Sequence, residues 1–507
     1  MSEGYTSVPA MIRAHAAARP GAIALVQDER QLSYGALADV MNRLAAALQR
    51  EGVAPRESVA ICAGTSIEYA CVFLGALQAG VAVAPIAPSS TADSIVDMIA
   101  DCGAKIFFLD KAVADELGDR LARVKAKLVA LDDGAPGAPY DEFIAPAGAQ
   151  PTPVALTAEM PFNIIYSSGT TGTPKGIVQS HGMRYGHVAR AQAMGYGEGA
   201  VTLLSTPLYS NTTLVSFFPT LGLGGTVVLM KKFDAAQYLA LARKHRVTHT
   251  MLVPVQYSRL MAREDFDAYD LSSFVMKFCT SAPFSAALKA DVLKRWPGGL
   301  IEYFGMTEGG GTCVLAAHVY PDKLHTVGQP APGHDIRVID EDGRELPRGE
   351  IGELVGRSEL MMSGYHNRKS QTDAATWVSP EGLAFIRTGD VGRFDADGFV
   401  ELMDRKKDMI ISGGFNIYPS DLEAVMRQHP DVTDVAVVGV PSADWGETPV
   451  AFVVSRGADA ETLRAFANER LGKTQRISAV ELIDELPRSH IGKILKRELR
   501  DAFAARG

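Results

Sequence analysis

The sequence predicts an α/β protein with a large N-terminal domain of doubly wound sheets plus a small β region, followed by a small α+β C-terminal domain. Three observations lead to this fold class. Short apolar strands alternate with helices up to about residue 324, Gly-rich turns and short strands follow from about 325 to 403, and the last hundred residues alternate again as a separate unit. Strands that alternate with helices favour a parallel, doubly wound sheet.

The first elements can be justified one by one. Residues 37–53, LADVMNRLAAALQREGV, carry an apolar stripe at helical spacing that ends at Gly52. The stripe consists of Leu37, Met41, Leu44 and Leu48. A strand at 58–63, a helix from about 66 to 79, a strand at 81–86, a helix near 91–101 and a strand at 105–110 continue the alternation. Further buried strands are expected at 162–168, 201–207, 225–230, 248–254 and 275–281.

The C-terminal hundred residues predict a unit of their own. Residues 419–430, PSDLEAVMRQHP, predict a helix with a capping box, in which Ser420 caps the third helical amide and Glu423 returns the bond. Strands are expected at 434–441, 449–455 and 480–484, with helices at 459–471 and 492–499. The charged stretch DRKKD at 404–408 is the candidate hinge, which gives predicted domains at 1–404 and 405–507.

Composition excludes several function classes. Apolar residues make up 47% of the 507 residues and charged residues 21%, as in an ordinary soluble globular protein. The net charge is −9 without a dense Lys/Arg run, so no nucleic-acid partner is expected. The five scattered cysteines suit a reducing, cytoplasmic location. Two long uncharged stretches, 69–92 and 199–230, are interrupted by Gly and Pro and are interpreted as buried core rather than membrane spans. Oligomeric state, monomer or homodimer, is left open.

Residues 166–176, YSSGTTGTPKG, combine glycines, hydroxyl side chains and one lysine after a buried strand. Glycines let backbone N–H groups approach an anion, and hydroxyls add donors. The run is not a Walker A loop, because Lys175 follows Pro174 and precedes Gly176 instead of Ser or Thr. The alternative interpretation is a Gly/Ser/Thr-rich surface loop. The complete pattern favours phosphate binding at the carboxyl edge of a sheet, where ligands of open α/β sheets bind.

This loop resembles the phosphate loop of the adenylate-forming superfamily, which contains acyl- and aryl-CoA synthetases, adenylation domains and luciferases. The other signatures follow in that superfamily's order: YFGMTE (303–308), TGD (388–390), DRKKDMI (404–410), SGGFNIYPSDLE (412–423) and PRSHIGK (487–493). The resemblance covers nearly the whole chain. It implies a large N-terminal domain, a mobile C-terminal domain, and an AMP-forming acid–CoA ligase that uses ATP, Mg²⁺ and coenzyme A.

The resemblance also implies which residues bind the nucleotide. Thr307 would touch the α-phosphate, and Glu308 would ligate Mg²⁺, a hard cation that prefers oxygen ligands. Phe304 would stack on adenine, Glu302 would accept from the adenine amine, and Asp390 with Arg405 would hold the ribose. The remaining ATP- and AMP-binding residues implied are Ser167, Ser168, Gly169, Thr170, Thr171, Gly172, Lys175, Ala282, Tyr303 and Gly305.

The same resemblance places Lys493 as the catalytic lysine, with Thr307 and Glu308 as its partners in catalysis. Lys493 would stabilise charge on the α-phosphate and the carboxylate rather than shuttle protons. The alternative is a solvated lysine at a helix start, where a cation opposes the helix dipole. Lys407 aligns with the hinge residue about which the C-terminal domain swings. Gly413 and Gly414 would then approach coenzyme A, since only Gly permits such close backbone contact.

The acid pocket is expected at 207–214, 279–283, Tyr303 and 309–312. Its predicted residues are Tyr209, Ser210, Thr212, Cys279, Ser281, Tyr303, Gly309 and Gly310. Many relatives have His where this chain has Ser210. No acidic residue occurs between 199 and 230, which disfavours an amino-acid substrate, and Tyr303 replaces the Arg of malonate-activating relatives. The Tyr303 ring favours a short or medium, branched or small aromatic monocarboxylate; a hydroxycinnamate or a medium-chain fatty acid stays open, and Tyr209 is equally consistent with a core aromatic.

Two rival functions share these motifs. A stand-alone adenylation enzyme would load the acid onto a carrier protein, although no carrier-domain Gly-x-Asp-Ser follows at the C-terminus. A luciferase-like oxygenase would use the same adenylate, but no luciferin pocket is readable. The sequence therefore favours a small carboxylic acid, ATP and coenzyme A as partners and leaves the identity of the acid open.

Overall fold

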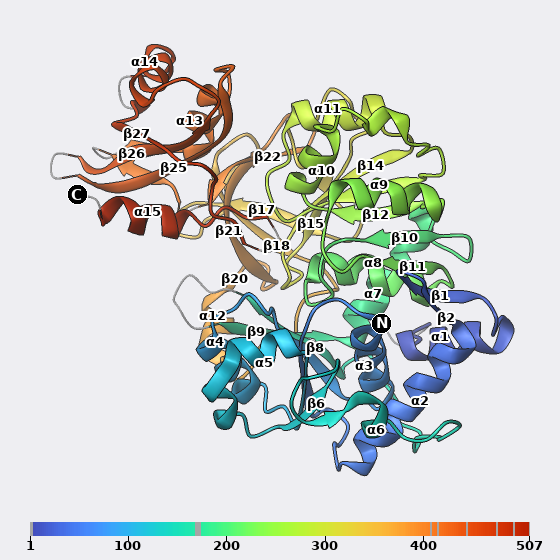
Figure 1. The fold of residues 1–507 in the computed structure, drawn as a ribbon. Helices are drawn as coiled ribbons and strands as arrows, with labels where there is room; N and C mark the ends of the chain where they lie inside the picture. Colours follow the sequence, from blue (N-terminus) through green and yellow to red (C-terminus); the bar gives the residue numbers. More distant parts are fainter. Residues whose placement is uncertain are drawn as a thin grey trace. The chain divides into compact units, whose positions relative to one another are not determined.

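The computed structural model describes residues 4–167, 174–405, 408–412, 415–442, 445–472, 475–489 and 492–505. The chain divides into two compact units (Figure 1). Unit 1 comprises Met1–Leu324, Ala331–His334 and Arg357–Ile386, and unit 2 comprises His325–Pro330, Asp335–Gly356 and Arg387–Gly507. The small β region thus clusters mostly with the C-terminal hundred residues. The sequence-based border at 404/405 stays a prediction.

Unit 1 contains two sheets, and the first has a parallel centre with antiparallel edges. Those of its strands that belong to unit 1 follow the spatial order β15 (Thr312–Ala316), β14 (Gly299–Gly305), β13 (Met276–Cys279), β12 (His249–Leu252), β10 (Val201–Leu204), β11 (Thr226–Leu229), β1 (Ile23–Gln27) and β2 (Arg30–Ser33). The strands from β14 to β1 run parallel, whereas β15 and β2 pair antiparallel with their neighbours. The predicted α/β class is confirmed. The edges deviate from it because β2 and β15 follow their partners through short turns that leave no room for a crossover helix.

The second sheet follows the order β19 (Gly364–Tyr365), β9 (Lys175–Ser180), β8 (Pro161–Ser167), β4 (Ala82–Pro85), β3 (Ser58–Cys62), β5 (Ile106–Leu109), β6 (Lys127–Ala130) and β7 (Ala138–Pro139). The strands from β8 to β7 are parallel. β9 pairs antiparallel with β8, and β19 pairs antiparallel with β9. Pro174 lies immediately before β9, so the predicted phosphate loop closes a hairpin and does not lead into a helix.

Helices cover these sheets, and several lie between them. They are α1 (Val8–Ala18), α2 (Tyr34–Arg50), α3 (Ile67–Gln78), α4 (Ala92–Asp101), α5 (Lys111–Leu117), α6 (Tyr140–Phe143), α7 (His181–Ala191), α8 (Asn211–Gly222), α9 (Ala235–Lys244), α10 (Pro254–Met261), α11 (Ala286–Arg295) and α12 (Lys369–Ala374). Apolar residues of α1, α2, α3 and α8 form one core with residues of both sheets. The predicted stripe of α2 is part of it, since all four of its residues are fully buried.

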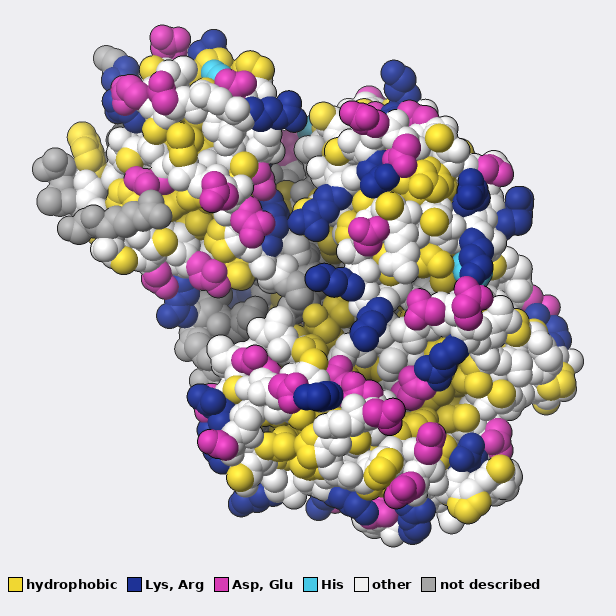
Figure 2. Space-filling view, viewed as in Figure 1, with side chains coloured by type: hydrophobic (Ala, Val, Ile, Leu, Met, Phe, Trp, Pro, Cys, Tyr) yellow, Lys and Arg dark blue, Asp and Glu magenta, His cyan; other side chains and the backbone are white. Residues whose placement is uncertain are grey.

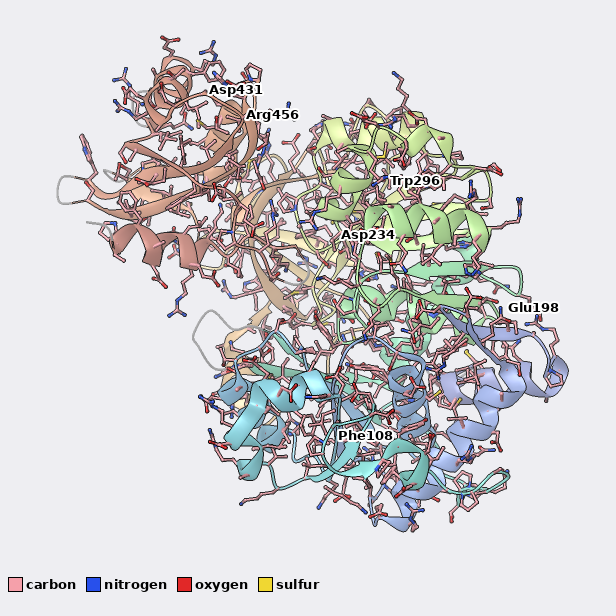
Figure 3. All side chains as sticks on the ribbon, viewed as in Figure 1. Phe108, Glu198, Asp234, Trp296, Asp431 and Arg456 are labelled. Atoms are coloured by element: carbon pink, nitrogen blue, oxygen red, sulfur yellow. The ribbon has the colours of Figure 1, made fainter. Side chains whose placement is uncertain are left out.

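Aromatic side chains pack in the interior of unit 1 near both of its sheets. Figure 3 labels Phe108 on β5 and Trp296 after α11. Phe108 meets the edge of Phe143 at 5.6 Å between ring centroids, and Trp296 meets Phe274 at 5.1 Å. Side-chain caps begin many of the surrounding helices, for example Asp234 at α9 and Ser180 at α7, each accepting from a backbone N–H.

Unit 2 holds the short strands β16 (Gln329–Pro330), β17 (Asp335–Ile339) and β18 (Gly352–Arg357), and the antiparallel pair of β21 (Ala384–Phe394) with β22 (Val400–Arg405). The first part of β21 lies in unit 1, where it pairs with β20 (Thr376–Val378). A further sheet contains β24 (Phe415–Ile417), β23 (Ile410–Ser412), β26 (Gly446–Ser455) and β25 (Val432–Ser442), with β27 (Ala479–Leu482) beside β26. Its helices are α13 (Pro419–Met426), α14 (Ala460–Arg470) and α15 (Lys496–Ala504).

The predicted capping box of α13 is wrong. The N-cap is Tyr418, which makes no side-chain cap bond, and Pro419 occupies the first turn. Ser420 instead donates to the Met403 carbonyl oxygen. Glu423 accepts from the Val437 amide at 2.9 Å and pairs with Lys496 at 3.0 Å. The helix begins at Pro419, earlier than the box requires, so Ser420 lies inside the first turn and both side chains bond to tertiary partners.

On the face shown in Figure 2, basic and acidic side chains are interspersed over both units. Among the described helices, none has the combination of length and hydropathy needed to span a bilayer.

His181 makes the stability of unit 1 depend on pH. Its ring is 1% exposed, packs edge-on against Phe162 at 4.9 Å, and has no hydrogen-bond partner for either nitrogen among the described residues. Burial lowers the pKa of His181 to about 4, below the value near 6.5 of an unfolded chain. As pH falls from about 6.5 to 4, the unfolded chain binds a proton that the folded chain refuses, so stability falls by up to ~1.4 kcal/mol per pH unit.

Urea unfolding of wild type and His181→Leu between pH 7 and pH 4.5 measures this contribution. The variant should lose less stability per pH unit than wild type. The difference between the two slopes should approach the value for uptake of one proton on unfolding. Parallel stability curves would contradict the assignment of a neutral, buried imidazole.

Candidate active site

The predicted phosphate loop is held at both ends by the β8–β9 hairpin. Tyr166 pairs with Gly176, and Ser167 pairs with Lys175. The Tyr166 hydroxyl donates to Asp101 at 2.7 Å, which fixes the end of β8. A Cβ on Gly176 would stand 2.7 Å from the Ile164 side chain, so glycine is required in this PKG sequence for close strand packing. Ser168, Gly169, Thr170, Thr171 and Gly172, and the Ser167 side chain, lie outside the described residues.

Lys175 and Glu308 meet at a common aromatic residue, Tyr365. The Lys175 ammonium stands 5.2 Å from the centre of the Tyr365 ring, and the Tyr365 hydroxyl donates to Glu308 Oε1 at 2.9 Å. Tyr365 reaches this position because β19 pairs with β9, with Tyr365 opposite Ile177. Burial, and then the Glu308 carboxylate, raise the pKa of Tyr365, so the phenol stays protonated and donates. Lys175 of the phosphate hairpin and Glu308, the predicted metal ligand, therefore both contact Tyr365.

Thr307 and Glu308 lie in the turn between β14 and β15, and other segments of unit 1 hold this turn. Gln179 Nε2 donates to the Thr307 carbonyl at 2.7 Å, and the Met362 amide donates to the Glu308 carbonyl at 2.8 Å. Gly309 has φ +74°, and a Cβ there would stand 2.1 Å from the Leu360 carbonyl oxygen. Only glycine fits at this position, which explains the first of the glycines after Glu308.

The predicted acid-pocket segments follow the carboxyl ends of two parallel strands of the first sheet, with β12 between them. Tyr209 and Ser210 follow β10, and Ser281 and Ala282 follow β13. Thr212 Oγ1 and Ser281 Oγ lie 2.6 Å apart, so the structure brings these two segments together. Ser281 has φ +84°, a left-handed conformation that is uncommon for a residue other than glycine and that occurs often at functional sites.

Tyr303 belongs to a row of stacked rings. Its ring lies 5.8 Å from that of Phe278 at 19° between planes, and Phe278 stacks in turn on Tyr196 at 5.8 Å. Thr280 Oγ1 donates to the Tyr303 carbonyl at 2.9 Å, which anchors β14 to the end of β13. Cys279 is fully buried and Ser210 nearly so. Tyr303 is thus held in two ways: its ring stacks on Phe278, and its backbone carbonyl accepts from Thr280.

Glu302 is buried as an ion pair with Lys289 of α11, and the two side chains are 5% and 2% exposed. Lys289 Nζ also donates to the Leu324 carbonyl at 2.8 Å. Burial raises the pKa of Glu302 to about 7, although Lys289 opposes the shift. The proposed contact of Glu302 with adenine stays a prediction. Phe304 and Gly305 complete β14, opposite Cys313 and Thr312.

The predicted ribose residues Asp390 and Arg405 face each other in unit 2. They are directly paired across β21 and β22. Thr388, two residues before Asp390 on β21, orients the backbone there: its hydroxyl donates to the Leu354 carbonyl at 2.8 Å and accepts from the Asp390 amide at 3.0 Å. The pairing places both residues at one end of a two-stranded ribbon. The Arg405 side chain lies outside the described part.

Lys493 lies on a turn, not on a helix. Arg488 and Ile494 form an isolated bridge, the Ser489 amide donates to the Lys493 carbonyl at 2.7 Å, and α15 begins only at Lys496. Lys493 therefore precedes the helix, and the predicted helix at 492–499 is wrong at its start; the role of Lys493 stays a prediction. Arg488 ties the turn to the sheet of unit 2 through Asp434 at 2.6 Å. Lys407, Gly413 and Gly414 lie outside the described residues.

Several residues of this site escape the sequence motifs. Tyr365 and Gln179 contact Glu308 and Thr307 from positions 57 and 128 residues away along the chain. Lys289 is a third example, since nothing in its surrounding helix marks it as the partner of Glu302. The sequence holds one weak signal for Gln179. Because alternate strand residues share a face, Gln179 lies on the same face of β9 as Lys175 and Ile177.

Comparison with known proteins identifies the family. Residues 12–366 match the family described as AMP-binding enzyme, and residues 421–493 match the AMP-binding enzyme C-terminal domain. The chain belongs to this family. The predicted class is confirmed: the protein is an enzyme of the adenylate-forming superfamily, of the AMP-forming acyl-CoA synthetase type. Binding of ATP follows from this membership.

Individual relatives cover nearly the whole chain. An indoleacetate–CoA ligase from Aromatoleum aromaticum is 34% identical, covering 97% of each chain. A fatty acid–[acyl-carrier-protein] ligase, ScoC, from Streptomyces coeruleorubidus is 32% identical, covering 96% of this chain and 95% of the relative. The ATP-bound crystal structure of MatB from Rhodopseudomonas palustris is 28% identical with a TM-score of 0.88, covering 98% of this chain and 99% of that one.

The Tyr365–Glu308 hydrogen bond predicts a specific loss of activity. Tyr365→Phe keeps the ring over Lys175 and removes the donor to the carboxylate, and a hydrogen bond to a charged group contributes about 1.5–3 kcal/mol. ATP–pyrophosphate exchange should therefore fall roughly 10- to 100-fold. Tyr34→Phe is the matched control, since Tyr34 donates to the Leu221 and Gly225 carbonyls in the core. The control should lose stability and keep its exchange rate; equal exchange in Tyr365→Phe and wild type would contradict the role of Tyr365.

Proposed function

We propose that the protein joins a monocarboxylic acid to coenzyme A. The carboxylate attacks the α-phosphorus of ATP and releases pyrophosphate, and the thiol of coenzyme A then displaces AMP from the acyl-adenylate. The acid is short or medium in length, branched or aromatic. The observation that supports this proposal best is the meeting of Lys175, from the phosphate hairpin, and Glu308 on the Tyr365 side chain.

Adenylation requires fixed cations and donors around the polyphosphate, because charge moves onto the leaving pyrophosphate as the α-phosphorus is attacked. Lys175 would supply one such charge at the β- and γ-phosphates, with the hydroxyls and amides of 167–172 as donors. Thr307 would contact the α-phosphate. Because Gln179 and Met362 fix both carbonyls of the Thr307–Glu308 turn, these groups would need no rearrangement when the nucleotide binds.

The residues present fit Mg²⁺. Within the described part of the chain, no cluster of three or more His, Cys, Asp or Glu side chains could hold a metal by itself. Glu308 offers one carboxylate beside the phosphate hairpin, and Mg²⁺ is commonly bound through one or two carboxylates plus substrate phosphates. Mg²⁺ bound there would offset charge on the polyphosphate. The Tyr365 hydroxyl would orient the Glu308 carboxylate toward it.

Lys493 would act in the adenylation step alone. The Arg488–Asp434 pair and the bonds between Ser489 and the Lys493 backbone attach Lys493 to unit 2, so the smaller unit would carry its charge. A swing about Lys407 would remove Lys493 and bring Gly413 and Gly414 toward coenzyme A. These steps rest on the superfamily resemblance.

The acceptor thiol has two candidates. Coenzyme A is favoured by relatives such as the indoleacetate–CoA ligase. A carrier protein is the second candidate, because the fatty acid–[acyl-carrier-protein] ligase ScoC is similar over nearly its full length. Both routes share the adenylation half-reaction and differ only in the thiol.

The pocket supports a compact acid. The Tyr303 ring stacks on Phe278 of β13, and the Tyr303 carbonyl accepts from Thr280, so the ring would limit the depth of the pocket at that point. The Thr212 and Ser281 hydroxyls lie at the carboxyl edge, where they would interact with a polar group of the acid. An aromatic acid has a precedent in the relative that is named for indoleacetate.

Exchange of labelled pyrophosphate into ATP against a panel of acids tests this function. The panel contains branched short-chain, medium-chain, small aryl, indole and hydroxycinnamic acids, with an amino acid and malonate as negatives. The expected result is exchange with a compact monocarboxylate and a thioester product when free coenzyme A is added. Exchange without any thioester would favour carrier-protein loading, and absence of exchange with every acid would overturn the proposal.

Lys493→Ala separates the two half-reactions. Removing one preorganised charge from the transition state should lower exchange about 100- to 1,000-fold. Thioester formation from preformed acyl-adenylate should stay largely intact. Lys496→Ala is the control, because Lys496 pairs with Glu423 inside unit 2 and should affect stability only. Equal loss of both half-reactions in Lys493→Ala would refute the assigned role.

A further inference from the structure

Arg184 is a buried cation at the centre of unit 1. It lies on α7 and is 1% exposed. In the described ranges it has no ion pair with a carboxylate. Instead, Nε and Nη2 each donate to Asn163 Oδ1 at 3.1 Å, and Nη2 also donates to Gln179 and, at 2.8 Å, to Asn211. The rings of Phe162 and Phe218 stand 5.8 Å from the guanidinium carbon.

The three acceptors come from three different segments. Asn163 lies on β8 and Gln179 on β9, the two strands of the phosphate hairpin. Asn211 is the first residue of α8, directly after Ser210 of the predicted acid pocket. Asn163 Nδ2 also donates to Gln179 Oε1 at 3.0 Å. One guanidinium therefore joins the phosphate hairpin of the second sheet to a pocket segment of the first sheet.

The network continues to the reacting centre. Gln179 receives Arg184 on its carbonyl oxygen and donates through its amide to the Thr307 carbonyl at 2.7 Å. Thr307 is the residue expected at the α-phosphate. The path from Arg184 to this turn is thus two hydrogen bonds long, and all of its members except Thr307 are nearly fully buried.

Stability alone gives a poor reason for this arrangement. A buried charge without a counter-charge is expensive, and burial lowers the pKa of Arg184 to about 9. Asn211 opens α8, and the positive end of a helix dipole adds to the unfavourable environment of a cation. The geometry instead favours a role in aligning the three segments, since an Arg fork can hold several acceptors in one fixed plane.

We propose that Arg184 is a positioning residue for adenylation, acting through Gln179 on the Thr307–Glu308 turn and through Asn211 on the acid pocket. The inference rests on the proposed function for its kinetic consequences. Arg184 contacts neither nucleotide nor acid in this proposal; it keeps the phosphate hairpin and the pocket in register so that carboxylate and α-phosphorus meet in line. Misplacement of about 1 Å can lower a rate about 100-fold.

Four variants test the proposal: Arg184→Lys, Arg184→Met, Gln179→Leu and the double variant Arg184→Lys/Gln179→Leu. Arg184→Lys keeps the charge and loses the fork, and should lower exchange kcat at least about tenfold while KM for ATP changes less than about threefold. Because Arg184 acts through Gln179, the double variant should be little worse than the poorer single variant. Hydrogen exchange of peptides covering 305–311 should be faster in each variant, with no substrate present.

Lys277→Met is the matched control. Lys277 is also a fully buried cation without a carboxylate partner in the described residues, and it donates to the carbonyls of Trp296, Pro297 and Gly298 at 3.2, 2.7 and 2.8 Å. It lies on β13 near the amino end of its sheet, where Met276 pairs with Gly299. The control should lower the unfolding midpoint, leave kcat within about twofold, and leave exchange at 305–311 unchanged.

The outcomes separate this inference from the proposed function. Wild-type rates in Arg184→Lys and Gln179→Leu, multiplicative losses in the double variant, or an equal kcat loss in Lys277→Met would each overturn the positioning role. If Arg184→Met fails to fold, Arg184→Lys and Gln179→Leu decide. If none of the acids supports pyrophosphate exchange by wild type, the proposed function fails, and hydrogen exchange alone tests the positioning role. Unchanged protection of residues 305–311 in Arg184→Lys would then overturn that role, and faster hydrogen exchange there would support it.

Discussion

The main constraint on this protein is that segments from two separate sheets must come together to form the proposed nucleotide site. The phosphate hairpin extends from the second sheet, whereas the Thr307–Glu308 turn and the acid pocket follow strands of the first. Hydrogen bonds from Tyr365 to Glu308 and from Gln179 to Thr307 connect the two sheets at this edge. Each bond joins residues far apart in sequence, so the site exists only once both sheets have folded and packed on the shared core of α1, α2, α3 and α8.

Three buried cations of unit 1 show how different partners give a charge different roles. Lys289 has a carboxylate partner, Glu302, and so fixes β14 next to Tyr303. Lys277 donates only to backbone carbonyls at the end of α11, which is a local structural task. Arg184 donates to side-chain amides of three segments that converge on the site. Its planar fork is the feature that a lysine could not reproduce.

Much of the fold follows from the sequence, because periodicity and motif order are local signals. The stripe of α2 and the parallel strands β3, β4, β5, β8, β10, β11, β12 and β13 were predictable in this way. The β8–β9 hairpin was not, since the loop pattern alone does not reveal whether a strand or a helix follows Pro174. The Ser420–Glu423 pattern misled, because tertiary partners at Met403, Val437 and Lys496 replaced the local cap. Tyr365, Gln179 and Arg184 carry no motif and become visible only through contacts across the two sheets. The assignments of Ser168 to Gly172, Lys407, Gly413 and Gly414 stay predictions.

The central claim is that the reaction divides ATP between its α- and β-phosphorus atoms and transfers AMP to a carboxylate. The most direct measurement follows ATP labelled at the α-phosphorus and an acid labelled with ¹⁸O in its carboxyl group, in the presence of coenzyme A. We expect labelled AMP that has gained one ¹⁸O atom from the acid, with pyrophosphate as the other product of ATP. Formation of ADP and orthophosphate, or AMP without ¹⁸O, would contradict the account.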